Sequence, residues 1–259
     1  MKIKFLFIAF LLSATAINAQ EEDDGGQNVF NHLAVSVNFG TPGIGFDLAA
    51  PICNYVEMRA GVTFMPHFKY DTDLDIETPN IEGYDFPDEV EVQGKLGFTN
   101  GEVLFDVFPT KKTGFHITVG AFFGSSDVIN VYNKEDGFLS DISEFNNKVE
   151  NGEIEHEKIG VILDDYLLEP DDNGNVNAYI KTRKFKPYVG LGWGRAVPKK
   201  RVNFGFDLGV QFWGTPKVYC NGLELTEENL DGEDGGIIKT ISKITVYPVL
   251  RFRISGRIF

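Results

Sequence analysis

Alternation of apolar and polar residues recurs along the chain and predicts β-strands rather than helices. In the clearest segment, 202–214, apolar side chains occupy every second position and glycine, asparagine, aspartate or glutamine stands between them. We expect eight strands of this kind, at residues 33–40, 44–50, 56–64, 102–108, 115–123, 188–194, 202–214 and 250–259. The pattern therefore indicates an all-β fold.

The connections between these strands are of two kinds, and the two kinds alternate. A tight turn at 41–43 and three long connections, at about 67–94, 125–184 and 214–243, alternate with short ones at 51–54, 109–114 and 195–201. Antiparallel neighbours place all the long connections at one end and all the short ones at the other. This is the layout of an eight-stranded antiparallel up-and-down transmembrane β-barrel with three long extracellular loops.

The two faces of the strands indicate which side points outward. The polar faces are rich in glycine and carry few of the long charged side chains of a soluble exterior, while the apolar faces hold more rings than a narrow lumen can pack. We therefore expect the charged residues inside, as a paired network that closes the lumen. The expected members are Asp47, Glu57, Arg59, Glu102, Asp106, Asp207, Arg251, Arg253 and Arg257. Periodicity alone leaves open a soluble periplasmic barrel that binds an apolar ligand inside.

The first 19 residues have the features of a secretory signal peptide, because two lysines precede an apolar stretch that ends in small residues. Residues 20–259 would then form the barrel domain. The formal net charge is −14, and the three long connections hold 29 of the 38 acidic residues. A nucleic-acid partner is therefore not expected.

Three segments carry a family resemblance: Lys186-Pro-Tyr-Val-Gly-Leu-Gly-Trp-Gly, Phe206-Asp-Leu-Gly-Val and the last strand, which ends in an aromatic residue. In these segments the chain resembles small outer-membrane β-barrel proteins of Gram-negative bacteria, of the outer-membrane protein A-like transmembrane type. The resemblance implies insertion into outer-membrane lipid by the barrel-assembly machinery, which reads the last strand. Phe259 is out of phase with the apolar face of that strand, and no peptidoglycan-binding domain is expected after it.

One motif in the first long connection suggests a metal site. Asp71, Asp73 and Asp75 alternate, and Glu82 stands at the twelfth position counted from Asp71, as in calcium-binding loops. The sixth position is Ile76, where such loops require glycine. A calcium site is therefore one hypothesis, and a solvated acidic loop is the other.

Two further groups of residues have a chemical interpretation. Cys53 lies in a short turn and Cys220 in a long connection, so we expect two free thiols at opposite ends of the barrel. His67, near Asp71, and the serines 125 and 126 could form a catalytic group at the rim, as in a lipid-modifying outer-membrane enzyme.

These features favour a monomeric, non-enzymatic protein of the cell outer membrane, without a cofactor. Its role would be structural, or it would bind an unknown extracellular partner through the acidic loops at the cell surface. A lipid-modifying enzyme with a site near His67 is the alternative, and the soluble periplasmic barrel is the second.

Overall fold

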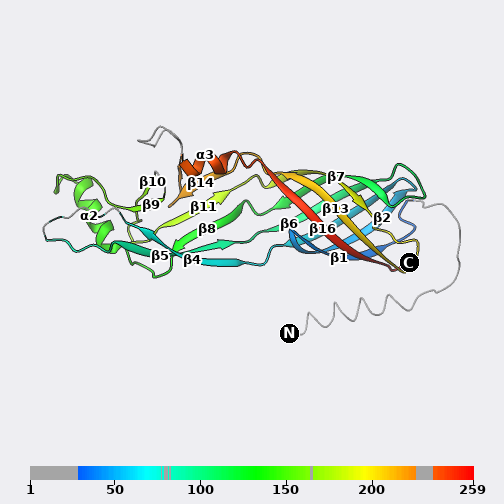
Figure 1. Ribbon diagram of the computed structural model, residues 1–259, viewed down its shortest axis with the longest axis horizontal. Coiled ribbons are helices and arrows are strands. Elements are labelled where there is room, and N and C mark those ends of the chain that lie inside the picture. The colour runs from blue at the N-terminus through cyan, green and yellow to red at the C-terminus, as the bar shows by residue number, and fades with distance from the viewer. Residues whose placement is uncertain (1–28, 77, 79–80, 82, 164–165, 226–235) are drawn as a thin grey trace.

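The computed structural model describes residues 29–76, 78, 81, 83–163, 166–225 and 236–259, and its main feature is a closed barrel. The signal peptide predicted at 1–19 lies outside these residues. The barrel strands are β1 (Ala34–Gly40), β2 (Gly43–Cys53), β3 (Val56–Phe64), β6 (Thr99–Val107), β7 (Phe115–Gly124), β12 (Phe185–Trp193), β13 (Val202–Phe212) and β16 (Val246–Arg257). They pair antiparallel in the order β1-β16-β13-β12-β7-β6-β3-β2, and β1 closes the ring against β2 (Figure 1). The predicted eight-stranded antiparallel barrel is confirmed.

The barrel exposes its apolar face and buries its polar face. On β13 the side chains of Phe204, Phe206 and Leu208 are 71%, 46% and 58% exposed, while Asp207 between them is 1% exposed. The same alternation holds on β2, β12 and β16, whose 11, 9 and 12 residues suit a membrane span. Since a soluble barrel must turn polar groups to water, this arrangement excludes the soluble alternative and is that of a transmembrane β-barrel.

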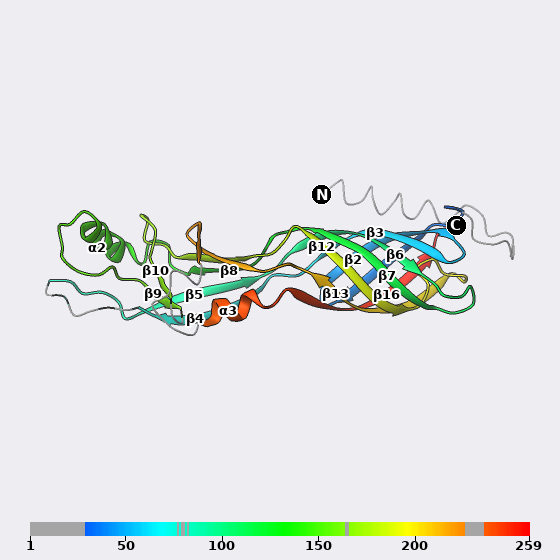
Figure 2. The same cartoon turned by 90° about the horizontal axis from the view of Figure 1, so that it is seen from above.

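The long connections are not loops, which corrects the sequence prediction. They contain β4 (Phe68–Asp75), β5 (Glu89–Leu96), β8 (Asp127–Asn133), β11 (Asn177–Lys181), β14 (Lys217–Cys220) and β15 (Leu223–Leu225), which form a six-stranded sheet in the order β15-β14-β11-β8-β5-β4. This order follows that of the barrel strands β16-β13-β12-β7-β6-β3. The sheet therefore continues five of the eight barrel strands past the rim, and β15 takes the sixth position, in line with β16 (Figures 1 and 2).

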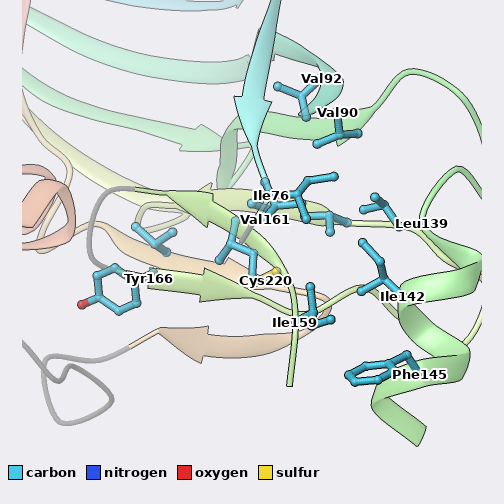
Figure 3. Close-up of a cluster of buried hydrophobic side chains, with 14 of the residues drawn as sticks. Ile76, Val90, Val92, Leu139, Ile142, Phe145, Ile159, Val161, Tyr166 and Cys220 are labelled. Carbon is cyan, nitrogen blue, oxygen red and sulfur yellow. The ribbon is translucent and has the colours of Figure 1, made fainter. Parts of the chain in front are cut away.

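We call this sheet, together with the elements packed on it, the extension. Those elements are α2 (Ser140–Glu150), the hairpin of β9 (Val161–Leu163) and β10 (Tyr166–Leu168), and α3 (Gly236–Ser242). A second hydrophobic core lies here, where Ile142 and Phe145 of α2, Val90 and Val92 of β5, and Val161 are all at most 2% exposed (Figure 3). The extension has this core because one face of each strand is apolar, even though the segments are acidic overall. Within the described residues, no helix is long and apolar enough to cross a membrane.

Candidate functional site

The inside of the barrel is crossed by an ion pair centred on Arg59. Its guanidinium donates to Asp106 of the neighbouring strand β6 at 2.7 Å and to Asp207 of β13 at 3.0 Å, and all three side chains are at most 2% exposed. In a ring of eight strands, β3 and β13 are four strands apart and therefore diametrically opposite. The Arg59–Asp207 contact thus spans the full width of the lumen.

A second ion pair crosses the barrel along another diameter. Arg251 of β16 donates from both terminal nitrogens to the two oxygens of Glu102 on β6, at 2.6 and 2.7 Å. These strands are also four apart in the ring, and both side chains are at most 2% exposed. Such bidentate, charge-assisted bonds are the strongest type between side chains. Charged side chains from opposite walls therefore meet inside the lumen along two diameters.

Asp207 is the centre of the network. It also accepts from Arg253 at 3.2 Å, and His116 Nε2 lies 3.0 Å from it. Asp106, His116 and Asp207 place potential ligand atoms within 4.8 Å of one another, as a metal site would. Arg59 and Arg253 already supply positive charge to these carboxylates, and a cation would meet their repulsion. The cluster is therefore suited to ion pairing and poorly suited to metal binding.

The end of the barrel with the short turns is closed by the connection between β12 and β13. Arg195 donates to Glu57 at 2.9 Å, and the backbone N–H groups of Ala196 and Val197 donate to the other oxygen of Glu57 at 2.8 and 3.0 Å. Ala196 and Val197 are fully buried. The sequence predicts this segment only as a short connection. It folds into the lumen because a buried carboxylate must have partners.

The opposite mouth of the lumen, below the extension, is filled by a lysine and three rings. Lys186 donates to Asn100 Oδ1 at 3.1 Å and to the backbone oxygen of residue 125 at 2.7 Å. Trp213 stacks on Tyr247 with 4.4 Å between ring centroids, and Phe98 meets both rings edge-on at 5.9 Å. Side chains therefore fill the lumen at both ends as well as in its middle.

Eight of the nine residues predicted for the lumen network are buried inside the barrel, although Glu57 pairs with Arg195 and not with the others. Asp47, the eighth, is buried on β2 and accepts from Asn38 at 2.9 Å. Arg257 is the exception and corrects the prediction, because it lies exposed at the end of β16, where the strand reaches the rim. The predicted network omits Lys186. This lysine is four residues from Gly190, and an even spacing along a strand places both residues on the inner face.

The expected calcium loop is not formed. Asp71, Asp73 and Asp75 lie on the regular strand β4, and alternate side chains on a strand are about 7 Å apart. Asp71 is already bound by Gln93 at 2.7 Å and by Lys134 at 3.2 Å, and these bonds lower its pKa. Glu82 lies outside the described residues. The motif is therefore the polar side of a strand.

In the possible catalytic group at the rim, His67 and Asp71 lie apart. His67 directly precedes β4, so Asp71 stands four extended residues, about 13 Å, further along the chain. Ser125 Oγ instead accepts from the backbone N–H of Thr99 at 3.1 Å. Cys53 and Cys220 are free and lie where they were expected, one at the turn end of β2 and one in the extension.

Comparisons with known proteins give only distant likenesses. No family model matches the chain, and no curated protein does. Among solved structures, CarO2 and CarO of Acinetobacter baumannii are 15% and 14% identical, each aligned over 89% of this chain and 99% of its own, with TM-scores of 0.49 and 0.47. A major outer membrane protein of Thermus thermophilus is 16% identical over 87% of this chain and 97% of its own, with a TM-score of 0.29.

The assignment of the chain therefore rests on its own geometry. A closed eight-stranded antiparallel barrel with an apolar exterior and a charged, filled interior is a structure of the outer membrane. The chain is an outer-membrane β-barrel protein.

Proposed function

We propose that the barrel is a closed membrane anchor and that the extension is a binding module displayed at the cell surface, with no catalytic role. The observation that carries the proposal is the pair of ion bridges across the lumen, Arg59–Asp207 and Arg251–Glu102. An eight-stranded barrel has room inside for little more than its own side chains, and here charged groups from opposite walls meet. Solutes are therefore not expected to pass.

The extension supports the binding part of this proposal. A membrane anchor alone needs only short connections at the rim, whereas here a six-stranded sheet stands beyond the rim and carries a hydrophobic core of its own. In outer-membrane barrels the short turns face the periplasm and the long connections face outward. The extension therefore lies on the cell surface as an ordered module.

Conductance in planar lipid bilayers tests the closed anchor. The full chain should give no steps above the background of the lipid. Steps comparable to those of a general porin would contradict the proposal. Replacement of both Arg59 and Asp207 by alanine removes one crossing, so this variant should conduct more than the wild type if the bridges close the lumen.

Labelling of intact cells tests the display. In a Cys53→Ala background, Leu223→Cys on the extension should react with a membrane-impermeant maleimide, because Leu223 is 74% exposed. Lys111→Cys, in the short turn between β6 and β7, is the matched control and should react only after cell lysis. The reverse pattern would show that the extension faces the periplasm.

A further inference from the structure

Strand β4 is an open edge of the extension. It pairs with β5 on one side. On the other side the described residues contribute no pairing strand along residues 68–73, while β9 lies beside the end of β4 and bridges Ile76 through Val161. In the barrel, β2 covers the corresponding edge of β3, but β2 begins only at Gly43, opposite the end of β3. Residues 68–73 are all exposed. Proteins normally blunt or cover such an edge, because it is a template for another strand.

The backbone of β4 presents hydrogen-bonding groups along this edge. The N–H of Ile76 donates to the oxygen of Asp88 at 2.8 Å, so this pair is of the hydrogen-bonded type. In an antiparallel ladder such pairs alternate with residues whose N–H and C=O point away from the partner strand. Counting back from Ile76, the groups of Lys69, Asp71 and Asp73 point to the open side.

The side chains beside this edge differ on the two faces of the sheet. On the inner face Phe68 and Tyr70 are 60% and 74% exposed, although both are large aromatic residues. On the outer face Asp73 forms no ion pair within the described part of the chain. On this outer face, β4, β5 and Lys134, which directly follows β8, carry more acids than bases. The five acids are Asp71, Asp73, Asp75, Glu89 and Glu91, and the three lysines are Lys69, Lys95 and Lys134.

We propose that β4 is a docking strand for an extended segment of another protein, in which basic and apolar residues alternate. The segment would add a seventh strand to the sheet through the backbone groups of Lys69, Asp71 and Asp73. Its basic side chains would lie beside the acids on the outer face, and its apolar side chains would cover Phe68 and Tyr70. The inference rests on the proposed surface-binding function and names the partner's chemistry.

A second copy of the chain fits this edge poorly. Two copies in one membrane stand upright, so a two-fold axis relating them runs along the membrane normal and their β4 strands run parallel. Rotation about this axis also turns the sheet over, so the acidic outer face of one copy would continue into the inner face of the other, which carries Phe68 and Tyr70. Neither face would then gain a complementary neighbour, whereas a segment with alternating basic and apolar residues matches both faces.

The test uses the full chain folded in lipid nanodiscs and a labelled eight-residue peptide of alternating valine and lysine. Fluorescence anisotropy should show that this peptide binds at least tenfold more tightly than the matched valine–glutamate peptide. Asp73→Pro removes one outward N–H without breaking the pairing to β5, because proline is tolerated at such edge positions. This variant should lose at least tenfold in affinity. Asp73→Asn keeps the N–H and should lose less, with a weaker dependence on salt.

Two controls keep the result decisive. The compact electrophoretic form of each variant reports that its barrel is intact, and a peptide N-methylated at alternate residues tests the backbone contacts with the wild-type protein alone. Equal binding of the lysine and glutamate peptides, full binding of the N-methylated peptide, or dimers that form through β4 and exclude the peptide would overturn the inference. None of these outcomes changes the conductance or the cell-surface labelling that test the proposed function. A failure of the docking inference can therefore be told apart from a failure of the proposed function.

Discussion

The ion pair between Arg251 and Glu102 gives the sharpest quantitative prediction. Glu102 is 1% exposed and accepts two short bonds from Arg251, so replacing the arginine by methionine leaves a buried carboxylate without its principal partner. Breaking a buried pair in this way costs about 3–5 kcal/mol of unfolding free energy, and Glu102→Met should cost a similar amount. The double variant removes both charges, and its stability should return to within about 1 kcal/mol of the wild type.

Urea titration of folding in phospholipid vesicles measures these free energies, with the electrophoretic shift between compact and unfolded forms as the readout. Arg257→Met is the matched control, because Arg257 lies on the same strand but is exposed, and it should change the stability by less than about 0.5 kcal/mol. A double variant as unstable as the sum of the two single variants would show that the charges act independently. That result would refute the claim that Arg251 and Glu102 compensate each other's burial across the lumen.

Three other predictions follow from the outer wall, the core of the extension and the thiols. Leu208→Arg, at the middle of β13 on the lipid face, should cost about 2–4 kcal/mol in the urea assay, whereas Leu223→Arg on the extension should cost less than about 0.5 kcal/mol. Phe145→Ala should destabilise the extension by about 3–5 kcal/mol, so that protease cleaves it while the barrel keeps its compact electrophoretic form. At neutral pH, maleimide should label Cys53 and spare Cys220, because burial raises the pKa of the Cys220 thiol to about 11; equal labelling rates would contradict this.

The barrel could be predicted from the sequence because every second side chain of a membrane-spanning strand faces lipid and must be apolar. On β13 the strict alternation around Phe204 and Phe206 reports directly which face meets hydrocarbon. The polar inner face could be predicted for the same reason, and with it the residues of the charge network. The pairing within the network could not, because the partner of Arg59 depends on which strand lies opposite β3 once the ring has closed.

The acidic composition of the three long connections predicts solvated loops, and this is why the sequence does not reveal the extension. Val90 and Val92 alternate with Glu89 and Glu91, which is already a strand pattern, and only the valine face is buried. Its partner strand β8 lies more than 30 residues further along the chain, so the pairing is nonlocal and leaves no signal in a single sequence. The calcium hypothesis arises for a related reason, since alternate aspartates on a strand and ligands in a loop share the same spacing.

The open edge of the extension follows from the unequal lengths of the barrel hairpins. The hairpin of β1 and β2 turns at residues 41–43, at the rim, while five of the other strands continue past it and β15 adds a sixth strand to the sheet. With no continuation of β1 and β2 to join them, β15 and β4 are the two edges of this sheet. At one of them β15 is only three residues long, and α3 precedes the return into β16. At the other, residues 68–73 of β4 lie exposed beside the short hairpin, with β5 paired on one side only. A single short turn thus closes the wall inside the lipid and leaves one edge of β4 open above it, where the proposed partner would dock.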